Sequence, residues 1–136
     1  MRGPADRRPR VLVVDDSRDL RDALGIILRD EGYHAVPAVN GLEALAVAER
    51  ERPDVIVLDF VMPRLDGPGF CRAYRGRGGT APIVLITAVL RVGIAEVRKH
   101  AAVCGAAAVL VKPFSIEKLL ATVGRLIAPT ALPEPS

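Results

Sequence analysis

VIVLDFVMPRLDG, residues 55–67, is the segment from which the architecture of this chain can be worked out. It opens with four apolar and mostly β-branched residues, a pattern typical of a strand buried on both faces of a parallel sheet. The run stops at one carboxylate, Asp59, and open α/β sheets bind their ligands at this carboxyl edge. Pro63 and the Asp66-Gly67 pair then predict a loop. An isolated aspartate would most simply cap a turn, so Asp59 has to be judged from the residues expected near it.

Length and composition predict one globular domain. The chain has 136 residues, half of them hydrophobic, which is enough for a single core. No apolar run approaches the ~18 residues of a membrane span, and no apolar stretch follows the basic N-terminal residues as in a signal sequence. We therefore expect a cytoplasmic protein that does not bind membranes. Cys71 and Cys104 fit no metal-ligand spacing and are expected to be reduced thiols in a core or on a helix.

The basic character of the chain comes from its N-terminus. The sequence pI is about 9.2, but four of the 19 basic residues lie within the first ten positions, and residues 11–128 hold 15 basic and 14 acidic residues. No basic recognition helix follows the tail, so we expect no nucleic-acid binding by this domain.

Apolar runs and helical periodicities alternate along the whole chain. Strands are expected at 11–14, 34–38, 55–58, 82–86 and 108–111, and each is followed by a helical pattern. Ser17 and Ser115 are expected to cap helices, and Val92 to Val103 is expected to form a helix weakened by Gly93. Five strand–helix repeats predict an α/β fold with a doubly wound five-stranded parallel sheet. We expect the domain to span 10–128, between a disordered basic tail at 1–9 and a disordered proline-rich tail at 129–136.

Polar residues end four of the five expected strands. They are Asp15 with Asp16, Asp59, Thr87 and Lys112, and parallel strands bring these ends to one edge of the sheet. Carboxylates ~4 Å apart repel by roughly 4 kcal/mol at an effective dielectric constant near 20. A divalent cation relieves this repulsion, and an all-oxygen set of ligands favours Mg²⁺. A metal ion, an ammonium and a hydroxyl around one carboxylate would stabilise a phosphoryl group on it.

These motifs resemble the receiver domain of bacterial two-component response regulators over about residues 10–128. The resemblance is carried by four segments in the family's order, namely Asp15-Asp16, residues 59–67, residues 82–88 and Val111-Lys112-Pro113-Phe114. It implies the flavodoxin-like (βα)5 fold with strand order 2-1-3-4-5.

The resemblance also implies the role of each site residue. Asp59 is the expected phosphoacceptor, and Thr87 and Lys112 are expected to contact the phosphoryl oxygens. Mg²⁺ is expected to be held by Asp16, Asp59, Asp15 partly through water, and the backbone carbonyl of Val61. The small residue Ala88 should leave room for phosphate, and the Lys112-Pro113 peptide bond is expected to be cis.

One position departs from the family pattern. Receivers often carry an aromatic residue, preceded by acidic residues, just before the last Lys-Pro pair, whereas this chain has Ala107-Ala108-Val109. Val109 therefore occupies the position of the aromatic switch. This departure leaves the phosphorylation chemistry intact, but it puts the usual read-out and the usual dimer in doubt.

Four hypotheses about function follow. The first is a phospho-accepting switch, not an enzyme. It receives its phosphoryl group from a sensor histidine kinase or a histidine phosphotransfer protein, and it then changes its binding to an unknown downstream protein. At this length it is expected to act alone, as a monomer or weak dimer. The second is a phosphotransfer intermediate or phosphate sink. The third, a pure interaction module, conflicts with the complete set of site residues. The fourth, a small phosphatase, would need a second acid where Val61 stands.

Overall fold

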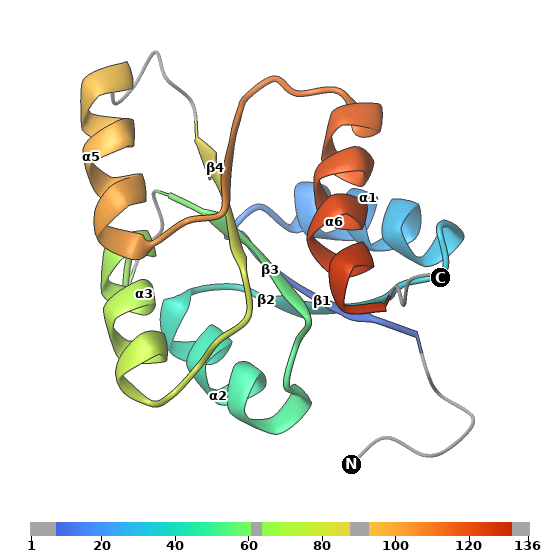
Figure 1. The fold of residues 1–136 in the computed structure, drawn as a ribbon, viewed down its shortest axis with the longest axis horizontal. Coiled ribbons are helices and arrows are strands. Elements are labelled where there is room, and N and C mark those ends of the chain that lie inside the picture. Colours follow the sequence, from blue (N-terminus) through green and yellow to red (C-terminus); the bar gives the residue numbers. More distant parts are fainter. Residues whose placement is uncertain (1–7, 61–63, 88–92, 132–136) are drawn as a thin grey trace.

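A computed structural model describes residues 8–60, 64–87 and 93–131 of the chain, in which strands and helices alternate (Figure 1). In chain order the elements are β1 (Arg10–Val14), α1 (Arg18–Asp30), β2 (His34–Ala38), α2 (Gly41–Glu51), β3 (Val55–Asp59), α3 (Gly67–Gly76), β4 (Ile83–Thr87), α5 (Ile94–Cys104), β5 (Ala108–Val111) and α6 (Ile116–Ala131). Each strand begins and ends within one residue of its predicted bounds. Val92, the expected start of the fourth helix, lies outside the described residues.

The five strands form one parallel sheet in the order β2-β1-β3-β4-β5. This confirms the predicted α/β fold and the flavodoxin-like order 2-1-3-4-5. Every residue of β3 and β4 is buried, as expected for strands covered by helices on both faces. β3 lies at the centre of the sheet, between β1 and β4.

Two cores lie on opposite faces of the sheet, because alternate residues of a strand point to opposite sides. On β1, Val11 and Val13 pack into the core under α1 and α6, whereas Leu12 and Val14 pack into the core under α2 and α3. Figure 1 shows α1 and α6 on one side of the sheet and α2, α3 and α5 on the other. The carboxyl ends of the strands are thereby held between two packed layers.

Side-chain caps begin four of the helices. Ser17 accepts a hydrogen bond from the Leu20 N–H at the start of α1, and Ser115 accepts one from Lys118 at the start of α6. Both caps confirm the sequence prediction. Asn40 caps α2 in the same way. Asp66, expected only as a turn residue, caps α3 by accepting from the Gly69 N–H at 2.9 Å.

The last helix is longer than the sequence predicted. α6 continues to Ala131, three residues beyond the boundary expected at 128. Pro129 lies in the last turn of α6 and does not end the helix, although its missing N–H removes one intrahelical hydrogen bond. The remainder of the proposed C-terminal tail (132–136), like positions 1–7 of the basic tail, lies outside the described residues. Across the described part of the chain, no helix combines the length and the apolar character needed to cross a bilayer.

Replacing Leu24 by alanine is expected to lower the free energy of unfolding by about 2–5 kcal/mol, because its side chain is 2% exposed in the core under α1. The matched control is Leu42→Ala on α2, where the leucine is 51% exposed and the expected loss is about 0.5 kcal/mol or less. Urea unfolding followed by circular dichroism measures both. Equal losses for the two variants would contradict the packing described here.

Candidate functional site

The predicted site residues lie at neighbouring strand ends. Asp15 directly follows β1, Asp59 is the last residue of β3, Thr87 is the last residue of β4, and Lys112 directly follows β5. Because β1, β3, β4 and β5 are adjacent in this order, these side chains meet at one edge of the sheet. Backbone hydrogen bonds continue the ladder beyond the strands, from the Lys112 N–H to the Thr87 carbonyl at 2.7 Å and from the Phe60 N–H to the Ile86 carbonyl at 2.9 Å.

Three carboxylates form the acidic part of this edge. Oxygen atoms of Asp15, Asp16 and Asp59 all lie within 4.8 Å of one another. Asp15 is 2% exposed and Asp59 is 7% exposed, whereas Asp16 faces solvent. Charges of one sign at this spacing repel by several kcal/mol when they are shielded from water, so the cluster requires positive charge nearby.

The side chain of Lys112 supplies part of that charge. Its Nζ lies 3.6 Å from Oδ2 of Asp15 and 3.8 Å from Oδ2 of Asp59. These distances are too long for direct hydrogen bonds, so the ammonium acts as a point charge between two carboxylates. The sequence predicted that Lys112 converges with these aspartates, and the geometry bears this out.

Two buried oxygen atoms at this edge have no hydrogen-bond partner among the described residues, Oδ2 of Asp15 and Oγ1 of Thr87. The other oxygen of Asp15 accepts from the Ser17 N–H at 2.8 Å, so its carboxylate is held with Oδ2 making no hydrogen bond and only the longer ion pair with Lys112. Leaving a buried polar atom unsatisfied costs about 1–3 kcal/mol. A cation at Asp15 and a phosphoryl oxygen at Thr87 would satisfy these atoms.

The donor set fits a hard divalent cation. Three carboxylates with at least one free buried oxygen match the oxygen ligands that Mg²⁺ prefers, and the exposure of Asp16 leaves room for coordinated water. Two further predicted positions, the backbone carbonyl of Val61 and the small side chain of Ala88, lie outside the described residues. The predicted cis peptide bond between Lys112 and Pro113 is present.

Val109 lies on the same face of the sheet as Thr87. In the register of β4 and β5, Leu85 pairs with Val109 and Thr87 pairs with Val111. Paired residues of a parallel ladder share a face, and Val109 packs half-buried against the core formed with α2 and α3. Val109, at the position where receivers often carry an aromatic residue, therefore has a short, β-branched side chain. It lies two residues before Val111, the ladder partner of Thr87.

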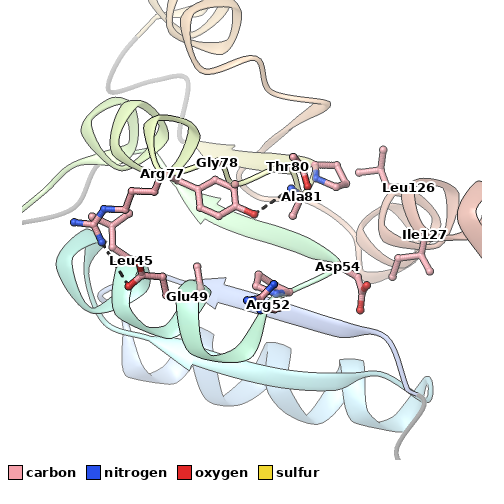
Figure 2. A pocket seen from close by; sticks show the side chains of 15 residues that line it. Leu45, Glu49, Arg52, Asp54, Arg77, Gly78, Thr80, Ala81, Leu126 and Ile127 are labelled. Carbon is pink, nitrogen blue, oxygen red and sulfur yellow. Dashed lines mark hydrogen bonds and ion pairs between the residues drawn. The ribbon is translucent and has the colours of Figure 1, made fainter. Parts of the chain in front are cut away.

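A cavity of about 600 Å³ lies at the opposite edge of the sheet (Figure 2). Its walls include residues that precede β3 and β4, the end of α2, and Leu126 and Ile127 of α6. Figure 2 shows the ion pair between Arg77 and Glu49 at one side of this cavity. Five-residue strands span roughly 16 Å, so the cavity is separate from the carboxylate cluster.

Sequence reasoning missed two contacts. Arg21 donates a hydrogen bond from Nη1 to the Asp15 carbonyl at 2.7 Å, and this contact holds the acidic segment against α1. The only feature of the sequence that could have indicated the contact is the position of Arg21 one turn after Ser17. Cys71 and Cys104, expected to be reduced thiols in a core or on a helix, are free and buried, and they also hydrogen bond to each other.

The sequence matches known proteins over most of its length. The family model of the response regulator receiver domain matches residues 11–124. The chain is 43% identical over 121 residues to response regulator MprA of Mycobacterium leprae (strain TN) and 44% identical over 121 residues to MprA of Mycobacterium tuberculosis (strain ATCC 25618 / H37Rv). These alignments cover 89% of this chain but 52% and 51% of those proteins, so the chain spans about half the length of the curated relatives it matches.

Solved structures agree with this assignment. Chemotaxis protein CheY4 of Vibrio cholerae superposes with a TM-score of 0.80 at 37% identity, covering 88% of this chain and 98% of that one. The receiver domain of the Francisella response regulator 1452 superposes with a TM-score of 0.82 at 30% identity, covering 90% and 99%. The chain belongs to the response regulator receiver domain family. It is therefore a phosphoacceptor of two-component signalling.

Replacing Asp16 by asparagine is expected to raise the free energy of unfolding by about 0.5–1 kcal/mol in metal-free buffer, because one of three mutually repelling carboxylates is removed and solvent screens much of the gain. Urea unfolding in the presence of a chelator measures the change. The control is Asp22→Asn on α1, whose carboxylate pairs with Arg18 on the surface and should change stability by about 0.5 kcal/mol or less. A less stable Asp16→Asn protein would show that the cluster is not strained by its own charge.

Proposed function

We propose that Asp59 accepts the phosphoryl group, donated by a sensor histidine kinase or a histidine phosphotransfer protein. The observation that carries this proposal is the position of its carboxylate at the end of the central strand. Asp59 lies within 4.8 Å of the acidic pair after β1 on one side, and it neighbours the end of β4 on the other. Lys112 Nζ lies 3.8 Å from its Oδ2.

The other two carboxylates are less suited to this role. Asp15 is almost completely buried and one of its oxygens accepts the Ser17 N–H, which lowers its nucleophilicity and its access to a donor. Asp16 is exposed, and among the described contacts Lys112 pairs with Asp15 and Asp59 but not with Asp16. Asp59 combines partial access with a neighbouring cation.

The proposed reaction is a phosphoryl transfer between two side chains. A carboxylate oxygen of Asp59 attacks the phosphorus of a phosphohistidine; the new O–P bond forms as the P–N bond breaks, and the imidazole leaves with the electron pair of that bond. The ammonium of Lys112 offsets the charge of the phosphoryl oxygens, and the unpartnered hydroxyl of Thr87 donates a hydrogen bond to one of them.

Mg²⁺ is the proposed cofactor, held by Asp15, Asp16 and Asp59, with the Val61 carbonyl as a further proposed ligand. When bound, the cation supplies positive charge that offsets both the carboxylates and the incoming phosphoryl group. The support for this choice is the all-oxygen cluster and the buried, unpartnered Oδ2 of Asp15.

The proposed output is a change in binding to a downstream protein, with the domain as a monomer or weak dimer. Phosphorylation can bias the structure only by interacting differently with its alternative states. Val109 has no ring to move, and its χ1 angle is restricted. We therefore expect the response to reside mainly in the segment after Thr87 and in the added charge. Val109 also favours the second candidate, a phosphotransfer intermediate or phosphate sink, in which conformational output is not required.

Asp59→Asn is expected to abolish phosphorylation, because the amide lacks the nucleophilic carboxylate oxygen. The wild-type protein is incubated with acetyl phosphate and Mg²⁺, and intact-mass spectrometry should show the addition of one phosphoryl group. Asp22→Asn should be phosphorylated like the wild type, and omitting Mg²⁺ should reduce wild-type phosphorylation at least tenfold. Equal phosphorylation of the Asp59→Asn protein would disprove the assignment.

The wild-type domain is expected to show only small amide shift changes along β5 and α6 when beryllofluoride mimics the phosphoryl group. Val109→Tyr should enlarge these shifts, because a ring could then occupy alternative positions beside Thr87. Two-dimensional NMR of both proteins with and without the mimic measures the response. Large shifts along β5 and α6 in the wild type, or tight dimerisation on adding the mimic, would show that valine does not weaken the switch and would count against the phosphate-sink alternative.

A further inference from the structure

Two cysteines from different helices meet in the core on the α3 side of the sheet. Cys71 lies in the first half of α3 and Cys104 is the last residue of α5, and their residues are 1% and 2% exposed. Both belong to the same hydrophobic core, and their thiols hydrogen bond to each other. Figure 1 shows α3 and α5 next to each other on this side of the sheet. Each sulfur is therefore placed against the other and largely shielded from other reactants.

The hydrogen bond within this pair favours one thiol as the nucleophile. The hydrogen bond donated by Cys71 lowers the pKa of Cys104; burial opposes this effect, and the positive charge of Arg72 adds to it. The same hydrogen bond, together with burial, raises the pKa of Cys71. Because the thiolate is the reactive form of cysteine, Cys104 is suited to attack first and Cys71 to react second.

Metal binding does not explain the pair. Structural zinc sites use four protein ligands and catalytic zinc sites use three. Among the described residues, the cluster of three possible metal-ligating side chains consists of Asp15, Asp16 and Asp59, and neither cysteine belongs to it. Two neighbouring thiols with opposite shifts in reactivity fit oxidation to a disulfide better than they fit coordination.

We propose that Cys71 and Cys104 form a reversible intramolecular disulfide when the protein meets hydrogen peroxide. The Cys104 thiolate attacks one peroxide oxygen, the O–O bond breaks, and hydroxide leaves to become water, so that Cys104 carries a sulfenic acid. The Cys71 sulfur then attacks the Cys104 sulfur, the S–O bond breaks, and a second water leaves. Overall, two thiols lose two hydrogen atoms and one peroxide is reduced to two waters.

Access of peroxide to the pair is provided by the weak construction of α5. Among the α5 residues whose side chains are described, only Val97 and Cys104 are buried. Helices with few buried contacts open locally at low free-energy cost, and peroxide is a small, uncharged molecule. Larger disulfides such as oxidised glutathione would require a wider opening.

The disulfide would join the end of α5 to α3, a helix that begins near the acidic edge. α3 begins just after the loop that leaves Asp59, and the Gly67 N–H donates to the Phe60 carbonyl at 3.3 Å. α5 leads into the start of β5, at the opposite end of that strand from Lys112. A covalent bond between α3 and α5 would restrict their relative movement. The thiol chemistry itself does not depend on phosphorylation of Asp59, so the two proposals can fail separately.

The test counts free thiols by mass spectrometry. Fully reduced wild-type protein is treated with hydrogen peroxide, unfolded in denaturant, and alkylated with iodoacetamide. Untreated protein should take up two alkyl groups; treated protein should take up none, and its peptides containing Cys71 and Cys104 should be joined with the loss of two hydrogen atoms. Dithiothreitol should restore both alkylation sites.

Single variants test the order of the two steps. Without a second thiol, Cys104 in the Cys71→Ala protein should remain a sulfenic acid that dimedone captures, whereas Cys71 in the Cys104→Ala protein should react at least tenfold more slowly. Reaction at equal rates would overturn the assigned order. The pairing itself would be overturned if treated wild-type protein still took up two alkyl groups, or if disulfides formed only between chains. That wild-type result does not depend on either variant folding.

Discussion

The crowding of charge at the carboxyl edge of the sheet is the constraint on which this structure depends. Three carboxylates lie within 4.8 Å of one another, and they are brought there because parallel strands end at the same edge. The Lys112 ammonium balances part of this charge at 3.6 Å and 3.8 Å from two of them. A folded scaffold must hold these groups together against their repulsion. The fully buried strands β3 and β4, packed on both faces, provide that scaffold. The repulsion that opposes folding also makes the edge receptive to a cation, whose charge would in turn offset that of an incoming phosphoryl group.

The two faces of the sheet are packed differently. Valines of β1 and leucines of α1 and α6 form one core, and the other core contains Phe70 stacked on Tyr74 at 5.5 Å between ring centres. The second face also carries Thr87, Val109 and the weakly capped helix α5. Thr87 therefore lies on the same face of the sheet as α5, in which only Val97 and Cys104 are buried among the side chains that are described.

The thiol pair of Cys71 and Cys104 lies on the same face of the sheet as Thr87 and α5. Cys71 and Cys104 link α3, which follows the strand that ends at Asp59, to the end of α5. Phosphorylation of Asp59, as proposed, would add charge at the edge of the sheet, whereas oxidation would add a covalent bond between α3 and α5.

The sequence by itself determined the strands, the caps of α1 and α6, and the residues at the strand ends, because runs of β-branched residues and polar stops are local patterns. Convergence of Asp15, Asp59, Thr87 and Lys112 also followed from the sequence, since parallel strands place their ends at one edge; the strand order itself came from resemblance to known receivers. The capping of α3 by Asp66 is a local contact with the Gly69 N–H that the prediction of a turn at Asp66-Gly67 missed. Only the tertiary structure decided the extension of α6 to Ala131, the lack of hydrogen bonds to buried oxygens of Asp15 and Thr87, and the meeting of Cys71 with Cys104. The surroundings of these oxygens and the meeting of the two thiols depend on distances between segments far apart in the chain, which no local pattern encodes.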